Sequence, residues 1–198
     1  MHSEQLTVYK PTPSAGLDAQ DDETLARQAR GDPQAFAELY GRFLDRVYRF
    51  ILIRTSSVQD AQDLTSQTFL AALENIGKYQ SRGSFGGWLF GIARHKVADH
   101  YRRRRVDVPL EDVEWLDHPD PSPEEIADAR LQLTRVSRAL QSLDGQQAEA
   151  LALRVFGELS AAEVGQMMGK TEGAVKMLVH RGLCKLQERL KYTLEVSL

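Results

Sequence analysis

Residues 84–105 have the sequence SFGGWLFGIARHKVADHYRRRR, and this stretch divides into two unlike halves. The first half is apolar and aromatic, whereas the second ends in four consecutive arginines, Arg102 to Arg105. The whole chain nonetheless carries a net charge of −3. Because Gly83 is a breaker and Ser84 can cap a helix, the stretch is predicted to be one long helix.

Two further helices are expected before this stretch. Asp32 followed by Pro33 combines a capping side chain with a proline at the first helical position. A second helix is expected from about Ser57 to Ile76, and the segment KYQSRGSF then indicates a loop. Helical spacing predicts a buried apolar face for this second helix, formed by Leu64, Phe69, Leu70 and Leu73.

The character of the chain changes after the arginines. Residues 106–121 are acidic, contain three prolines and show no sustained period, which is typical of a linker. Helix signals resume at Ser122 and at Asp144. Residues 159–190 then combine a capping box at Ser160, a tight glycine turn and a longer helix.

No strand pattern persists anywhere in the sequence, so the predicted fold class is all-α, with two helical domains joined by an acidic flexible linker. The expected boundaries are a disordered N-terminal tail at 1–21, a first domain at 22–105, the linker at 106–121 and a second domain at 122–198. With 42% hydrophobic residues, the composition is that of a soluble globular protein with enough apolar residues for a core.

Several classes of site and location are disfavoured. The single cysteine, Cys184, excludes an internal disulfide and a multi-cysteine zinc site, and its place on the apolar side of the helix predicts a packed thiol. His95 and His100 are five residues apart, so a helix turns them away from each other. We therefore expect no enzyme activity, no metal and no cofactor. A signal peptide and a membrane span are not indicated, which favours a cytoplasmic location.

The long helix also has the composition of a single-strand binding site. The cationic residues begin before the arginine run, with Arg94, His95 and Lys96. The aromatic residues near the preceding loop are Tyr79, Phe85 and Trp88. Unstacked bases bind to aromatic rings beside cationic grooves. The alternatives are a solvated helix end for the arginines and core packing for the aromatic residues.

Residues 160–190 have helix-turn-helix proportions. A DNA-reading helix presents polar and cationic side chains near its N-terminus to base edges and phosphates. The second helix of this pair carries such a set on one side, namely Glu172, Gly173, Lys176, Met177, His180 and Arg181. An ordinary helical hairpin with a solvated face is the alternative.

Taken together, the chain resembles bacterial RNA polymerase sigma factors of the extracytoplasmic-function group (ECF, group IV), within the sigma-70 family. DAQDLTSQTFLAAL at 60–73 is similar to region 2.2, and the stretch at 84–105 is similar to regions 2.3 and 2.4. LSAAEVGQMMGKTEGAVKMLVHRGLCKL at 159–186 is similar to region 4.2. The motifs stand in the family's order, and the resemblance covers residues from about 24 to 190.

The resemblance implies a dissociable polymerase subunit that directs promoter recognition, DNA melting and transcription initiation. The first domain would be region 2-like and bind core RNA polymerase and the minus-ten element. The second domain would be region 4-like and bind the minus-thirty-five element as duplex. Expected partners are core RNA polymerase, promoter DNA as duplex and melted strand, and an anti-sigma factor, with no membrane insertion.

The resemblance also assigns residues to these contacts. The group on or near the core polymerase-binding helix is Asp60, Asp63, Gln67 and Phe69. The minus-ten group is Tyr79, Ser84, Phe85, Trp88, Arg94, His95, Asp99, Arg102 and Arg103. The minus-thirty-five group is Thr171, Glu172, Gly173, Lys176, Met177, His180 and Arg181.

The sequence departs from the family pattern in three segments. The usual Asp-Leu-Val-Gln-Glu of region 2.2 is DLTSQ at 63–67, so an acidic charge is lost at Gln67. The common Val-Lys-Ser-Arg of region 4.2 is VKML at 175–178, and the usual asparagine of the long helix is His95. Two alternatives stay open, namely an autonomous helix-turn-helix regulator and a sigma-like polymerase adaptor.

Overall fold

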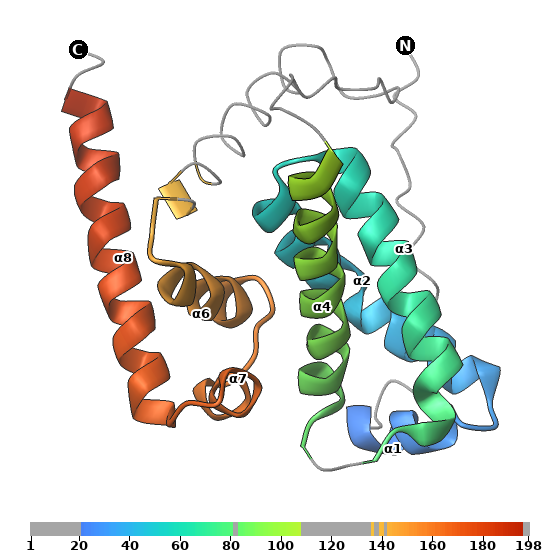
Figure 1. Cartoon of the computed structure of the whole chain (residues 1–198). Helices are drawn as coiled ribbons and strands as arrows, with labels where there is room; N and C mark the ends of the chain where they lie inside the picture. Colours follow the sequence, from blue (N-terminus) through green and yellow to red (C-terminus); the bar gives the residue numbers. More distant parts are fainter. Residues whose placement is uncertain (1–20, 81–82, 108–135, 137–138, 141, 196–198) are drawn as a thin grey trace, which may run out of the picture.

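A computed structural model describes residues 21–80, 83–107, 136, 139–140 and 142–195 of the chain. Within these residues every regular element is a helix, so the all-α prediction is confirmed. Figure 1 shows the order of the elements. They are α1 (Asp22–Gln28), α2 (Pro33–Thr55), α3 (Val58–Asn75), a 3-10 turn (Ile76–Lys78), α4 (Phe85–Asp107), α6 (Gly145–Val155), α7 (Ala161–Met168) and α8 (Glu172–Glu195).

The helix starts in the first part of the chain follow the local signals. The Asp32 side chain accepts a hydrogen bond from the backbone N–H of Gln34 at 2.9 Å, and the Ser57 hydroxyl accepts from the N–H of Asp60 at 3.2 Å. Both are N-caps, which satisfy donors that a helix leaves unpaired at its start. The short α1, which Asp21 caps in the same way, was not expected from the sequence.

The first domain packs α2, α3 and α4 around a phenylalanine core (Figure 1). Phe43 meets Phe85 edge to face with ring centroids 5.3 Å apart, and Phe50 meets Phe90 in the same manner at 5.5 Å. All four rings are almost completely buried. Because burying one such side chain contributes about 1.5–3 kcal/mol, these pairs fix α4 firmly against α2.

The second domain packs α6, α7 and α8 around smaller apolar residues such as Leu151, Val164 and Val175. Ser160 and Glu163 form the predicted capping box at the start of α7. Gly169 ends α7 with φ at 64°, the left-handed conformation that glycine adopts without a steric penalty. This turn leads directly into α8.

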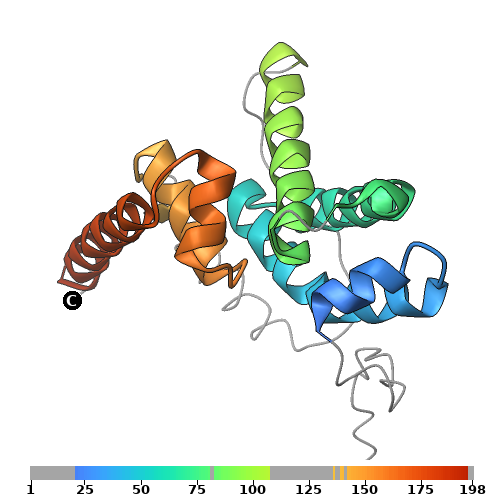
Figure 2. The same cartoon turned by 90° about the horizontal axis from the view of Figure 1, so that it is seen from below.

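The two domains contact each other through α2 and α4 on one side and α6 and α7 on the other. Figures 1 and 2 agree that α8 lies on the side of α6 and α7 that is away from the first domain. Most of the expected linker, the tail up to residue 20 and the helix start at Ser122 lie outside the described residues. None of the described helices has the length and hydropathy needed to cross a membrane.

Candidate nucleic-acid interface

The aromatic residues at the start of α4 form one cluster with Trp88 at its edge. The ring of Trp88 lies 5.0 Å from that of Tyr79 and 5.6 Å from that of Phe85, measured between centroids. Tyr79 is 2% exposed and Phe85 is 1% exposed, whereas Trp88 is only half-buried. For Tyr79 and Phe85 the core-packing alternative is therefore the one observed, because neighbouring helices already cover their rings. Both rings pack against the ring of Trp88.

The short helix α1 holds this cluster in place through Glu23. The Glu23 carboxylate accepts a hydrogen bond from the Tyr79 hydroxyl at 2.7 Å and another from the backbone N–H of Phe85, the first residue of α4. Arg30 donates to the backbone carbonyl of Tyr79. A carboxylate at a helix N-terminus is electrostatically favourable. Glu23 was missed in the sequence because its partners are more than 50 residues away.

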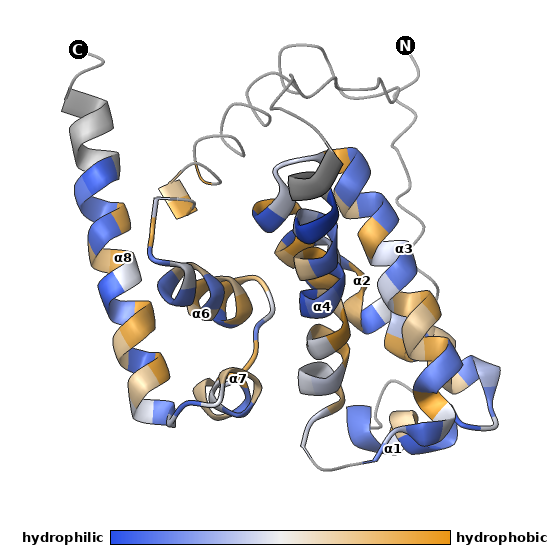
Figure 3. Ribbon diagram, in the orientation of Figure 1, coloured by the Kyte–Doolittle hydropathy of each residue, from blue (hydrophilic) through white to orange (hydrophobic). Residues whose placement is uncertain are grey.

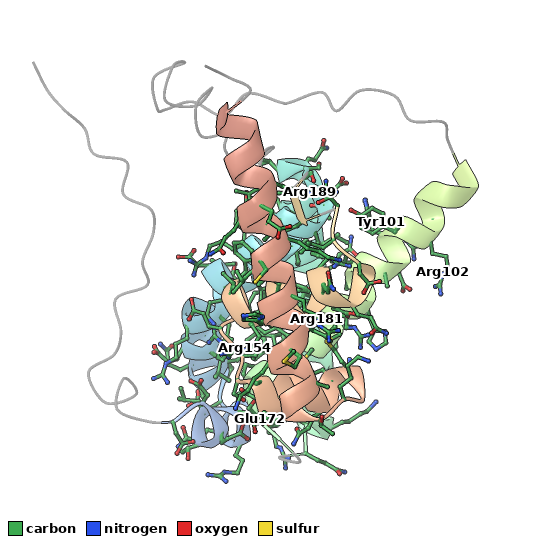
Figure 4. The ribbon with its side chains drawn as sticks, turned by 90° about the vertical axis from the view of Figure 1, so that its left-hand side faces the viewer. Tyr101, Arg102, Arg154, Glu172, Arg181 and Arg189 are labelled. Atoms are coloured by element: carbon green, nitrogen blue, oxygen red, sulfur yellow. The ribbon has the colours of Figure 1, made fainter. Side chains whose placement is uncertain are left out.

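The second half of α4 presents its cations to solvent. His95, Arg102 and Arg103 are exposed, and Arg102 pairs with Asp99 at 2.9 Å one turn earlier. Figure 3 shows hydrophilic residues gathering toward this end of α4. In Figure 4 the end of α4 that carries Tyr101 and Arg102 extends beyond the other helices. The side chains of the last two arginines of the run lie outside the described residues.

Two residues of the predicted minus-ten group are half-buried and contact the second domain. Arg94 is half-buried, forms an ion pair with Glu149 of α6 and donates to the backbone carbonyl of Met167 in α7 at 2.9 Å. The Ser84 hydroxyl donates to the carboxylate of Glu163 in α7. The sequence contains no local signal for either contact.

On α3 the predicted polymerase-binding residues differ in accessibility. Asp63 and Gln67 are exposed, and Asp60 is half-buried with its carboxylate 3.6 Å from His100. Phe69 is buried, with its ring 4.6 Å from that of Tyr40. Of this group, Asp63 and Gln67 are thus the exposed members.

The prediction that Leu70 and Leu73 belong to a buried face of α3 is wrong. Leu70 is 57% exposed, and Leu73 is exposed as well. The other two residues of the predicted face, Leu64 and Phe69, are buried, together with Ala61, Thr65, Thr68 and Ala72. The exposed leucines follow Asp63 and Gln67 along α3, so the accessible part of this helix combines polar and apolar side chains.

The helix-turn-helix formed by α7 and α8 matches the expected proportions. The Thr171 hydroxyl caps α8 by accepting from the N–H of Ala174 at 3.2 Å. Lys176 pairs with Glu172 at 2.6 Å, and this hydrogen bond lowers the pKa of the Glu172 carboxyl below its ordinary value. All seven residues of the predicted minus-thirty-five group are exposed, and Figure 4 labels Glu172 and Arg181 along α8.

The prediction that Cys184 is packed is wrong, because its side chain is exposed. The face of α8 that meets the rest of the domain carries Leu178, Gly182 and Leu186. Cys184 lies on the opposite face of the helix. Its sulfur is 3.9 Å from Nε2 of His180. Among the described residues, no three side chains of the metal-binding types gather in one place.

Both groups of helices match models of known protein families. Residues 39–106 match the model of Sigma-70 region 2, and residues 139–188 match that of Sigma-70, region 4. The ECF RNA polymerase sigma factor SigF of Caulobacter vibrioides is 35% identical over 173 residues, which cover 84% of this chain and 92% of that protein. The chain belongs to the ECF RNA polymerase sigma factors, in the sigma-70 family.

Other ECF sigma factors show the same relationship. BldN of Streptomyces coelicolor is 39% identical over 171 residues, which cover 85% of this chain and 65% of BldN. The solved structure of CnrH in complex with the cytosolic domain of CnrY has a TM-score of 0.68 and 27% identity, over 86% of this chain and 97% of CnrH. The predicted class of function, an RNA polymerase sigma factor, is thereby confirmed.

The two matched regions correspond to the two groups of helices. Region 2 covers most of α2 and all of α3, and it ends within α4. Region 4 covers α6, α7 and the first part of α8, so it includes the whole helix-turn-helix of this ECF sigma factor. The aromatic cluster and the exposed cations of α4 thus fall in region 2.

Proposed function

We propose that this ECF sigma factor, of group IV, is a dissociable subunit that directs RNA polymerase to promoters and helps to melt them. The observation that carries the proposal is the construction of α4. Its first turns are anchored by buried aromatic rings, and its last turns carry exposed His95, Arg102 and Arg103. A rigid helix that begins beside a half-buried tryptophan and ends in cations suits a melted strand.

In this proposal the first domain, 22–105, binds the minus-ten element as a single strand. Trp88 contributes the accessible edge of the aromatic cluster, while Tyr79 and Phe85 hold it in position. His95, Asp99, Arg102 and Arg103 follow the strand along α4, and Ser84 and Arg94 join them once their contacts with the second domain are released. Phosphates are the natural partners of these arginines.

The second domain, 122–198, binds the minus-thirty-five element as duplex. Helix α8 enters the major groove with its N-terminal turns, where Lys176, His180 and Arg181 are exposed. Glu172 holds Lys176 by an ion pair on the same face. Since the arginine common in the family at position 178 is a leucine here, these cations carry the phosphate contacts.

Core RNA polymerase and an anti-sigma factor are the proposed protein partners. The accessible part of α3, with Asp63, Gln67, Leu70 and Leu73, offers the mixed polar and apolar surface that protein interfaces use. CnrH, a relative in structure, is known in a complex with the cytosolic domain of CnrY. We propose a cytoplasmic protein that catalyses no bond chemistry and requires no cofactor.

Run-off transcription with purified core polymerase tests the proposal. Templates include the DNA upstream of the protein's own gene, and binding to core polymerase is scored in the same reaction. Specific transcripts that appear only with the protein, together with permanganate-reactive thymines near the start site, support it. The double variant Asp63→Ala and Gln67→Ala should weaken core binding, whereas Gln34→Ala on the exposed start of α2 should not.

The same experiment separates the two alternatives. Binding to core polymerase without initiation on any template favours the sigma-like adaptor. Sequence-specific duplex binding by the protein alone, with no association with core polymerase, favours the autonomous regulator.

A further inference from the structure

Helix α1 precedes the residues that match Sigma-70 region 2, which begin at residue 39, yet it packs as part of the first domain. It lies against α2 and the start of α4 (Figure 1). Leu25 and Ala26 on its inner face are completely buried. Asp22 forms an ion pair with Arg42 of α2, with Oδ1 and Nη1 2.9 Å apart. Apolar packing and this ion pair therefore hold α1 in place.

Glu23 connects α1 with the chain on both sides of the loop that precedes α4. Its Oε2 atom accepts a hydrogen bond from the Tyr79 hydroxyl at 2.7 Å, and its Oε1 atom accepts from the backbone N–H of Phe85. Tyr79 directly follows the 3-10 turn after α3, and Phe85 is the first residue of α4. One carboxylate thus holds both ends of the connection between these two elements.

The contact with Phe85 also completes the start of α4. The first N–H groups of a helix have no partner within the helix. The Ser84 hydroxyl accepts from the N–H of Gly87 at 2.9 Å, and Glu23 accepts from that of Phe85. Because helix starts attract anions, the Glu23 carboxylate takes the place that a phosphate could otherwise occupy there. The start of α4 is thereby left to contact a base and not the strand backbone.

The aromatic rings beside this loop are attached to the same carboxylate. The centroids of the Tyr79 and Phe85 rings are 5.9 Å apart, and both rings pack against Trp88, which lies about one turn later in α4. Trp88 is half-buried, whereas the other two rings are almost completely buried. A displacement of either buried ring would therefore change the edge that Trp88 presents to solvent.

Arg30 holds Tyr79 from the same part of the chain. Its guanidinium donates to the backbone carbonyl of Tyr79, while the hydroxyl of that tyrosine donates to Glu23. The main chain and the side chain of Tyr79 are both held in this way, which restricts the movement of its ring.

We propose that Glu23 is a positioning residue for the capture of an unstacked base of the melted strand. It acts through Tyr79 and Phe85, which keep the accessible edge of Trp88 in one orientation, and it does not touch the strand itself. This inference rests on the proposed function, because that function assigns a base to Trp88. A binding group must be held in a narrow range of positions by the residues around it, and Glu23 supplies this support.

A contribution to folding alone is the alternative role for Glu23, and Asp22 provides the matched control. Both residues belong to α1, and each carries a carboxylate that binds another part of the first domain. Asp22 pairs with Arg42 of α2, whereas Glu23 binds the residues beside Trp88. Removing either charge can weaken the packing of α1, but only the loss of Glu23 should alter the position of Trp88.

Photocrosslinking of the full-length protein, alone and bound to core polymerase, measures base capture separately from strand binding. The probes are single strands of random sequence with one central 5-iodouracil or 5-iodocytosine, which crosslink to an adjacent aromatic ring on irradiation. We expect Glu23→Gln to lower the crosslinking yield at Trp88 about three- to tenfold relative to Asp22→Asn, because stacking is weakened. Total strand binding, measured by fluorescence anisotropy, should stay within about twofold, because the arginines of α4 still bind phosphates.

Equal yields at Trp88 in the two variants would overturn the proposal, and so would the absence of a crosslink at Trp88 in the original protein. Tyr79→Phe provides a second variant, since it keeps the ring and removes the hydroxyl that donates to Glu23. It should lower the yield less than Glu23→Gln does, and Glu23→Gln should have a smaller effect in its presence. Fully independent effects of the two substitutions contradict an action through Tyr79.

The orientation of Trp88 can also be followed without DNA. The chain has two tryptophans, so a Trp115→Phe background leaves Trp88 as the only fluorescent indole. Time-resolved anisotropy should show more rapid motion of this ring in Glu23→Gln than in Asp22→Asn. The same motion in both variants would show that Glu23 does not hold the ring, a result that a loss of overall stability does not imitate.

These outcomes are distinguishable from a failure of the proposed function. If the crosslink at Trp88 depends on Glu23 but no core-dependent transcript appears, the sigma role in initiation fails and the positioning role stands. If transcripts appear and both variants crosslink equally, the positioning role fails and the sigma role stands.

Discussion

Helices α4 and α8 are nearly equal in length, with 23 and 24 residues, and both are proposed to contact DNA, yet their surroundings differ. The first half of α4 contacts α1, α2 and α7, so most of its side chains there are core residues or interdomain partners. Within the described part of the chain, α8 packs against α6 and α7 on one face. On the other face every predicted contact residue is exposed.

This difference shows that the composition of a helix does not decide what it can touch. Arg94 and Arg181 are both arginines on predicted DNA-facing helices. Arg94 is held by Glu149 and the Met167 carbonyl, whereas Arg181 is exposed. The first domain must therefore lose contacts before it can use its full surface, and the second needs no such step.

The greatest loss of stability is expected at the aromatic start of α4. Phe85→Ala removes a ring that is packed against Phe43, Tyr79 and Trp88, and it should cost about 3–5 kcal/mol of unfolding free energy. Met177 on α8 is 51% exposed, so Met177→Ala should change stability by less than about 0.5 kcal/mol. Urea unfolding followed by circular dichroism measures both. Similar losses would show that the two helices are equally buried.

A smaller change in stability is expected when alanine replaces one glycine of α7 or one glycine of α4. A Cβ at Gly165 would lie 2.7 Å from the backbone oxygen of Lys170, so Gly165→Ala should distort the helix-turn-helix and cost about 1–3 kcal/mol. Gly91 lies within α4 with no atom within 4 Å of the added Cβ. Gly91→Ala should therefore stabilise by up to about 1 kcal/mol. Thermal unfolding of both variants would decide, and a gain for Gly165→Ala contradicts the close approach.

The pH dependence of stability tests the role of Glu163. Its carboxylate accepts hydrogen bonds from Ser160 in its own domain and from Ser84 in the first domain. Burial raises the pKa of its carboxyl, but hydrogen bonds from Ser160 and Ser84 and the charge of Arg46 together lower it below the ordinary 4.5. A lowered pKa stabilises the folded state above the unfolded value, and this stabilisation is lost as pH falls through the folded value.

Glu163→Gln should therefore be less stable than the original protein at neutral pH, and the difference should shrink as the pH falls below about 4.5. Denaturant unfolding over a pH series measures it, with Glu188→Gln as the control that keeps the original dependence. A difference that is the same at every pH would mean that ionised Glu163 gains nothing from its partners.

Loss of one exposed arginine from either helix should have a minor effect on DNA binding. Arg103→Ala should reduce the salt slope of opened promoter complexes by about 0.7, the value for one contact with a single strand. Arg181→Ala should reduce the slope for duplex binding by about 0.9. Filter binding over a salt series measures both slopes. An unchanged slope for either variant removes that arginine from the phosphate contacts.

Much of the fold follows from short-range signals in the sequence. The starts of α2, α3, α6 and α7 were predicted from capping residues, and the observed caps involve partners two or three residues away. The glycine turn before α8 was predicted in the same way. Such contacts are local, so neighbouring residues are sufficient to specify them.

The exposure of individual side chains was predicted less well. Leu70, Leu73 and Cys184 were expected to be buried and are exposed, whereas the aromatic residues offered for bases are mostly core. A helical period indicates which residues share a face, but it does not indicate how far a neighbouring helix covers that face.

Local signals along the chain were thus sufficient to predict the described helices after α1, their order and the two candidate DNA-binding segments. The contact of Glu23 with the aromatic cluster and the ion pair of Glu149 with Arg94 depend on the packing of distant helices. The physical reason is distance along the chain, since Arg94 and Glu149 are 55 residues apart and Arg46 and Gly157 are 111 apart. Partners so distant are brought together by packing of the two domains, for which no local pattern exists.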